Sequence, residues 1–177
     1  MAFFVGKMLN SKQMKLLIGL GNPGEKYAKN RHNAGAIFVS QFSISNKNPN
    51  IKAVNTDAFM NDSGKFVAKA VRKYLEGAGD TGELGDLYVA HDDLDLPLGQ
   101  YKIQKGVGPK VHRGLQAVEK ELGTTDFRRI RIGVDNRDPQ NRTPGEEYVL
   151  EDFTKEEREI LENVFNRIIE ELKNAAD

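Results

Sequence analysis

Short apolar runs, separated by polar and turn-forming stretches, predict several strands along the chain. Residues 15–20 and 86–90 are mostly apolar, which is typical of buried strands. Residues 129–134 alternate with period two, as a half-buried strand does, and residues 99–104 alternate like a strand at an exposed edge. Residues 51–54 are a candidate for a further short strand.

The segments between these strands have apolar residues at helical spacing. Residues 34–44, 58–75 and 114–122 have this spacing, and Gly123 ends the third of these helices. Residues 154–174 predict a long amphipathic helix that begins at a threonine cap with acidic residues in its first turn. Because strands and helices alternate, we predict a single α/β domain with a mixed, largely parallel twisted sheet and helices on both faces.

Length and composition are those of one globular domain. The chain has 177 residues, 38% of them hydrophobic and 29% charged, and we expect a domain over 14–177 preceded by a disordered extension at 1–13. No apolar run approaches the roughly 18 residues of a membrane span. The chain has no cysteine, which excludes thiol nucleophiles and cysteine-based zinc sites and agrees with a cytoplasmic protein.

Charge is unevenly distributed along the chain, although the formal net charge is zero. Residues 100–131 carry eight basic against three acidic residues, whereas residues 143–177 carry eleven acidic against four basic ones. The acidic block has a simple explanation as the solvated face of the last helix. The basic segment indicates a surface that can hold phosphates.

A glycine motif at residues 19–24, Gly-Leu-Gly-Asn-Pro-Gly, follows the first predicted strand. It matches the dinucleotide-binding pattern G-x-G-x-x-G, which also needs a helix at the third glycine and an acidic residue about 20 positions later. Pro23 stiffens this loop, and residues 40–50 contain no acid. The sequence therefore does not favour a dinucleotide-binding enzyme.

Three histidines lie in polar stretches beside apolar runs, namely His32, His91 and His112. Histidine can exchange a proton near neutral pH, so a histidine near an aspartate and several amides can act as a general base in hydrolysis. Ligands in α/β folds bind at the carboxyl ends of strands, where Asn22 and Asp92 are predicted to lie.

Four segments in this order resemble the bacterial-type peptidyl-tRNA hydrolase family across about residues 15–152, which is most of the chain. The segments are Gly19–Gly24 with Tyr27 and Arg31-His32-Asn33-Ala34-Gly35, then Phe59-Met60-Asn61-Asp62-Ser63-Gly64, then Val89–Pro97, then Phe127–Gly133. The resemblance implies a monomeric α/β enzyme that cleaves the ester between a peptide and the 3′ end of a tRNA. It also implies that neither a metal nor another cofactor takes part.

The resemblance assigns catalytic roles to four residues. His32 corresponds to the base, and Asp92 to the carboxylate that orients it. Asn22 and Asn61 correspond to amides that hold the peptide backbone and the developing oxyanion. Each of these residues taken alone could be a turn, surface or cap residue without a catalytic role. The assignment rests on the four segments occurring together in this order. His91 is expected to be structural.

The resemblance also places Tyr27 and Met60 in the same cleft, with Tyr27 beside the terminal nucleotide. Arg131 aligns with a basic position of the family, and Lys105 is a candidate from its neighbourhood, so both are predicted to hold the terminal phosphate. Arg113 lies beside the predicted site and is a further candidate for contact with the substrate.

The glycine-rich loop before the fourth segment departs from the family pattern. Arg113 stands where the family has an asparagine that orders the catalytic water, and Lys110 and Val111 replace glycines. Arginine cannot accept a hydrogen bond, and lost glycines restrict the backbone. The segment at residues 43–58 is also shorter than in the family, which predicts a smaller sheet at one edge.

Two other functions stay open at this point. The chain could be a non-catalytic or weakly catalytic RNA- or protein-binding relative on the same scaffold, an alternative that Arg113 supports. It could also be an esterase or amidase for a small substrate, which would not need the basic segment at residues 100–131.

Overall fold

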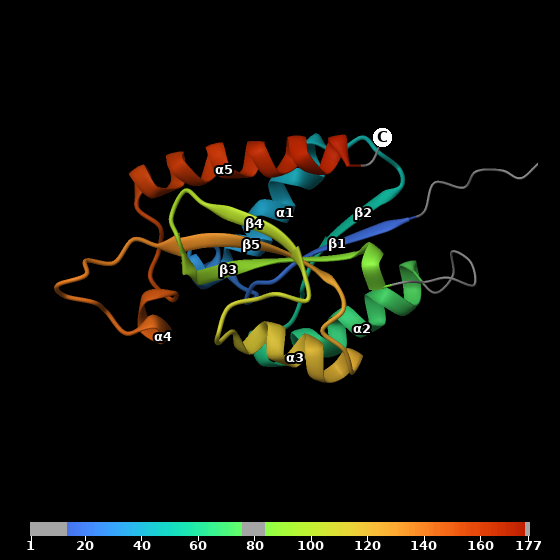
Figure 1. Cartoon of the computed structure of the whole chain (residues 1–177), viewed down its shortest axis with the longest axis horizontal. Coiled ribbons are helices and arrows are strands. Elements are labelled where there is room, and N and C mark those ends of the chain that lie inside the picture. Colours follow the sequence, from blue (N-terminus) through green and yellow to red (C-terminus); the bar gives the residue numbers. More distant parts are fainter. Residues whose placement is uncertain (1–13, 76–83, 176–177) are drawn as a thin grey trace, which may run out of the picture.

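The computed structural model describes residues 14–75 and 84–175 (Figure 1). The predicted extension at residues 1–13 and most of the predicted connection at 77–85 lie outside the described residues. Among the residues described, no helix is long and apolar enough to cross a membrane.

One five-stranded sheet organises the described part of the chain, with the strand order β2-β1-β3-β5-β4. The strands are β1 (Lys15–Gly19), β2 (Ile51–Asn55), β3 (Leu87–Pro97), β4 (Tyr101–Lys105) and β5 (Arg128–Asp135). All neighbours are parallel except β4, which pairs antiparallel with β5 at the edge. The predicted mixed, largely parallel sheet is confirmed, and β2 forms its other edge.

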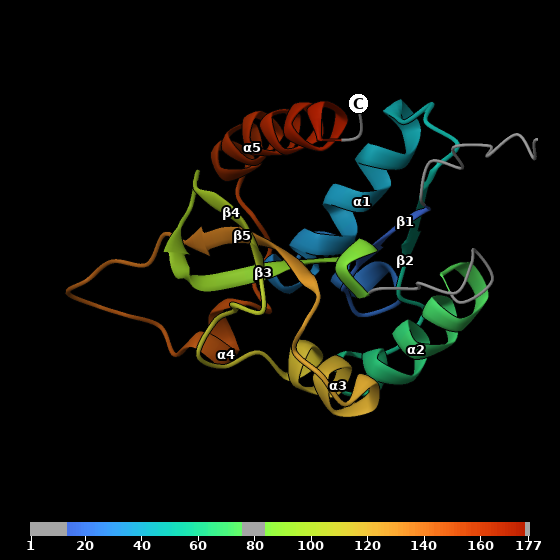
Figure 2. The same ribbon diagram turned by 45° about the vertical axis from the view of Figure 1, so that its right-hand side comes forward.

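Helices cover both faces of this sheet (Figures 1 and 2). On one face lie α1 (Ala34–Ser45) and α5 (Lys155–Asn174), and on the other lie α2 (Ser63–Tyr74) and α3 (Arg113–Leu122). Each face has its own core, centred on Phe38 and Phe165 beneath the first pair and on Val67 and Val118 beneath the second. The short α4 (Gly145–Tyr148) lies in the connection between β5 and α5.

Local signals at the helix ends behave as the sequence predicts. Thr154 caps α5, since its hydroxyl accepts the backbone N–H of Glu157 while the Glu157 carboxylate accepts the N–H of Thr154. Gly123 ends α3 in the left-handed conformation with φ of 68°.

Three predicted elements need correction. β3 does not end before His91 but continues through His91–Asp93 to Pro97, because these polar side chains find partners inside the protein. β5 is buried on both faces rather than on one, because Arg129 and Arg131 on its second face are themselves buried and pair with Glu119 and Asp93. The helix predicted from residue 58 begins at Ser63, after a 3-10 turn at Met60–Asp62.

Close contact between α1 and β3 brings the start of α1 against the strand that carries Asp92. A Cβ atom at Gly35 would collide with the backbone carbonyl of Ala90 and lie 3.0 Å from the Cα atom of His91. A glycine is therefore needed where α1 begins.

We predict that Gly35→Ala lowers the free energy of unfolding by about 1–3 kcal/mol, because the added methyl group overpacks this contact. Urea unfolding measures the change. Ile44→Ala is the control on the same helix, because its side chain is 87% exposed, and it should change stability by less than about 0.5 kcal/mol. Equal stability of the two variants would contradict the prediction.

Candidate active site

A cavity of about 520 Å³ opens where β1 ends beside β3. β1 pairs with β3 only as far as Gly19 opposite Ala90, so the next residues of β3 face the loop after β1 instead of a strand. This is the point where the strand order reverses, which is the usual ligand site of such sheets. The lining residues are Asn22, His32, Phe59, Met60, Asn61, Asp92, Leu94, Val111, His112, Arg113, Gly145, Glu146, Val149 and Leu150.

The carboxylate of Asp92 joins two histidines at the base of the cavity. Its Oδ1 atom lies 2.9 Å from His32 Nδ1 and 2.9 Å from His112 Nε2. His112 Nδ1 accepts the backbone N–H of Leu115, so Nε2 carries the proton that His112 donates to Asp92. His32 likewise donates from Nδ1 to the ionised carboxylate, which leaves the lone pair of the neutral ring on Nε2.

Burial and neighbouring charges shift the pKa values of His32 and Asp92 in opposite directions. Burial lowers the pKa of His32, but the charge and hydrogen bond of Asp92 outweigh it, and the net pKa is raised despite the nearby Arg113. Burial raises the pKa of Asp92, but His32 and His112 together hold it well below its usual range. Asp92 is therefore ionised, and it stabilises the protonated form of His32.

His91 lies beside this pair without entering the cavity. Its ring packs edge-on against His112 at 5.1 Å, and Nδ1 lies 2.7 Å from the carbonyl oxygen of Asp92. Burial and the neighbouring His112 lower its pKa to about 3, so His91 is neutral at physiological pH. These contacts agree with the structural role expected for it.

The Asn22 amide is held in one orientation. Its Oδ1 atom accepts the backbone N–H of Met60 at 2.9 Å, while its backbone N–H donates to Asn33 Oδ1 and its carbonyl accepts from Asn33 Nδ2. The Nδ2 group of Asn22 thus remains as a donor at the cavity wall. Asn61 is exposed at the rim of the same cavity, on the 3-10 turn that also carries Met60.

The structure brings Met60 but not Tyr27 into the cavity lining. Met60 is buried beneath the rim. Tyr27 packs edge-on against Phe59 with 6.2 Å between ring centroids, and Phe59 in turn lines the cavity. Tyr27 therefore supports the rim through Phe59.

Arg113 lies at the mouth of the cavity, at the start of α3. Its guanidinium is 3.0 Å from a carboxylate oxygen of Glu146, and both side chains are mostly exposed. An exposed pair of this kind contributes little to stability, so Arg113 can exchange Glu146 for another anion.

Lys105 and Arg131 are not brought to this cavity. Arg131 is buried, with Nε 2.7 Å from Asp93 and Nη1 2.8 Å from Gln104, so its charge neutralises an acid inside the sheet. Lys105 pairs with Asp126 at the end of β4 that lies opposite the start of β5. The basic residues at 100–131 are therefore not gathered at one surface. Arg131 lies in an internal ion pair, Lys105 lies at the end of β4, and Arg113 lies at the cavity mouth.

Several cavity residues escape sequence reasoning. Glu146, Val149 and Leu150 form a wall around α4, and no motif or periodicity marks them. Phe59 lies in the segment that resembles the family and directly precedes Met60, but sequence reasoning assigns it no role, and the structure places its exposed ring in the cavity lining.

One group among the described residues could hold a metal ion, namely His32, Asp92 and His112, whose ligand atoms lie within 4.8 Å of one another. A metal ligand needs the lone pair of its nitrogen, whereas His112 Nε2 carries a proton because Nδ1 accepts from Leu115. The arrangement therefore fits hydrogen bonding from two histidines to one carboxylate better than a metal site.

Fold and site together define an α/β protein equipped for general-base chemistry, with a histidine held by a buried carboxylate at the strand switch point. The family model for peptidyl-tRNA hydrolase matches residues 16–177. The peptidyl-tRNA hydrolase of Pseudothermotoga lettingae is 37% identical over 171 residues, covering 89% of this chain and 87% of the relative. That of Thermodesulfovibrio yellowstonii is 36% identical over 177 residues, covering 90% of each.

A solved structure agrees in fold. The crystal structure of peptidyl-tRNA hydrolase from Acinetobacter baumannii matches with a TM-score of 0.72 at 24% identity, over 90% of this chain and 87% of that one. This chain belongs to the peptidyl-tRNA hydrolase family.

We predict that Asp92→Asn lowers the pKa of His32 below that of the unmodified protein, because burial then acts on the ring without the opposing carboxylate charge. Titration of the imidazole ring protons by NMR measures this pKa. Asp57→Asn is the control, since Asp57 is exposed and does not line the cavity. An unchanged His32 pKa in Asp92→Asn would contradict the prediction.

Proposed function

We propose that this protein hydrolyses the ester bond between peptide and tRNA in peptidyl-tRNA, which releases free tRNA for reuse. Membership of the family supports the reaction. The observation that carries the assignment in this chain is the hydrogen bond from His32 to Asp92 at the cavity. As the resemblance implies, we further propose that the protein acts as a monomer in the cytoplasm.

In the proposed mechanism His32 is the general base. Its Nε2 lone pair takes a proton from a water molecule, whose oxygen attacks the ester carbonyl carbon. The resulting imidazolium is stabilised by Asp92, and the C–O bond to the 3′ oxygen breaks when this proton passes to the leaving oxygen. The ester is already activated, so the protein mainly has to place the water and the base.

Two amides are proposed to hold the carbonyl side of the substrate. Asn22 offers only its Nδ2 donor, because its oxygen is occupied by the Met60 backbone. Such a fixed donor suits an oxygen on which negative charge develops. Asn61, at the rim, is proposed to hold the peptide backbone with its donor and acceptor together.

Contact with the acceptor end of tRNA is proposed for Arg113, because it is exposed, lines the cavity and pairs with Glu146, whose carboxylate is itself exposed. The sequence predicts that Lys105 holds the terminal phosphate, but Lys105 does not line the cavity, so we propose that it contacts a more distant phosphate instead. Arg131 is less suited to this role, because its guanidinium is already bound by Asp93 and Gln104.

A second candidate function is RNA binding without turnover, and Arg113 is the observation that favours it. A guanidinium at the cavity can bind a phosphate but cannot accept a hydrogen bond from water as an amide does. Retention of the His32–Asp92 bond favours the hydrolase.

We predict that His32→Ala slows peptide release from a model peptidyl-tRNA by about 10²–10⁴-fold, because it removes the general base. Single-turnover release assays measure the rate, and circular dichroism verifies the fold. Lys69→Ala is the control, an exposed residue on α2 that should release peptide at the unmodified rate. Equal release by His32→Ala and the unmodified protein would reject the hydrolase.

We predict that Arg113→Asn raises the rate of peptide release, because an amide can order the catalytic water, while it weakens tRNA binding. The slope of log K for tRNA against log salt should shrink by about one unit, as for the loss of one phosphate contact. If the unmodified protein binds tRNA without release and only Arg113→Asn releases peptide, the second candidate function holds instead. An unchanged salt slope would contradict the assignment of Arg113 to a phosphate.

A further inference from the structure

A buried arginine lies directly before the proposed base. The side chain of Arg31 is 5% exposed, and that of its partner Glu157 is 6% exposed. Their charged groups are 2.7 Å apart. Removal of a charge from water is unfavourable unless it is paired and hydrogen-bonded, so the other contacts of Arg31 determine what this residue does.

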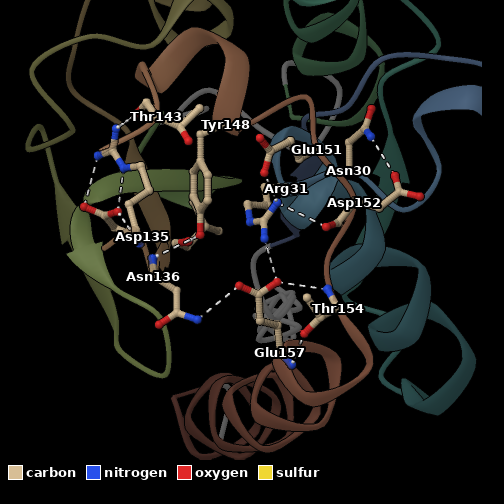
Figure 3. A network of polar contacts seen from close by, with 12 residues as sticks. Asn30, Arg31, Asp135, Asn136, Thr143, Tyr148, Glu151, Asp152, Thr154 and Glu157 are labelled. Atoms are coloured by element: carbon tan, nitrogen blue, oxygen red, sulfur yellow. Dashed lines mark hydrogen bonds and ion pairs between the residues drawn. The ribbon is translucent and has the colours of Figure 1, made fainter. Parts of the chain in front are cut away.

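Figure 3 shows that these contacts come from the connection between β5 and α5. The Nη1 group of Arg31 donates to the carbonyl oxygen of Asp152 at 3.1 Å and reaches Glu151 at 3.4 Å. The guanidinium also stacks over the ring of Tyr148, 4.1 Å from its centroid. One side chain therefore holds this connection at several points.

The backbone around Arg31 is tied to the same segment. The N–H of Arg31 donates to the carbonyl of Glu151, and the N–H of His32 donates to the carbonyl of Val149 at 2.7 Å. Asn30 adds a side-chain bond to Asp152. The 3-10 turn Arg31–Asn33 that carries His32 is thus fastened to a segment that also forms the cavity wall.

Glu157 links this assembly to the rest of the fold. Besides Arg31, its carboxylate accepts the N–H of Thr154 in the cap of α5 and the Nδ2 group of Asn136 at the end of β5. Asn136 in turn donates its backbone N–H to the Tyr148 hydroxyl (Figure 3). The position of the turn is therefore set from α5 and β5 together.

From these contacts we propose that Arg31 is a positioning residue for the reaction: the Arg31–Glu157 pair sets His32 against Asp92 and holds the Val149–Leu150 wall beside it. Arg31 does not line the cavity and acts through the turn that carries His32. The proposal rests on the proposed function for its catalytic consequence. Its structural part concerns the free protein alone.

Lysine cannot replace Arg31 in this role. The planar guanidinium serves Glu157 and the Asp152 carbonyl in different directions while its face lies on Tyr148. An ammonium group keeps the charge but has neither the fork nor the flat face. Arg31→Lys therefore tests geometry at constant charge.

We expect Arg31→Lys to lower kcat by about 10- to 100-fold, because a small displacement of the base is costly, with a smaller change in KM because Arg31 does not touch substrate. In the free protein the NMR-measured pKa of His32 should fall, because the bond to Asp92 that raises it is loosened. Glu157→Gln should shift both quantities in the same direction. It also serves as the second variant if Arg31→Lys does not fold.

Glu156→Gln is the matched control, because Glu156 is the exposed neighbour in the same first turn of α5 and should leave kcat and the His32 pKa unchanged. Folded Arg31→Lys with the kcat and His32 pKa of the unmodified protein would overturn the proposal. A loss of kcat without a shift of the His32 pKa would also overturn it. If the unmodified protein does not release peptide, the proposed function fails, while the His32 titration still decides whether Arg31 positions the ring.

Discussion

The ionised carboxylate of Asp92, buried at the centre of the sheet, is the constraint on which the site depends. A buried charge needs compensation, and two histidines supply it by hydrogen bonding, His32 from the turn before α1 and His112 from the start of α3. The two histidines precede helices that cover opposite faces of the sheet, so one oxygen atom of Asp92 links the starts of α1 and α3. Loss of the carboxylate would remove the hydrogen bonds that orient both His32, the proposed base, and His112.

The sequence predicts those parts of the structure that local patterns determine. Apolar runs predict β1 and the start of β3, and the threonine cap predicts the start of α5. The continuation of β3 through His91–Asp93 is not predictable from polarity, because its burial depends on partners far along the chain. Arg131 shows the same limit, since only the register of β3 against β5 places it beside Asp93.

The sequence predicts those site residues that lie in the family-like motifs. His32, Asp92, Asn22 and Asn61 all line one cavity, as the resemblance implies. The wall around α4 was not predictable, because Glu146, Val149 and Leu150 come from an irregular connection whose place is set by tertiary contacts with the turn before α1. A contact that depends on two distant segments leaves no periodic signal in either.

The altered loop before α3 changes the surface of the site more than its interior. No non-glycine residue in the described ranges has a positive φ, so Lys110 and Val111 occupy their positions without left-handed backbone. Both side chains are exposed, whereas His112 between them and α3 is buried and caps the helix while it donates to Asp92. Substitutions at the exposed positions next to His112 can therefore change what the cavity mouth binds without moving the His112 side chain. Arg113, with its exposed partner Glu146, lies at the cavity mouth, so a substitution there can change what the cavity binds without moving His32, the proposed base.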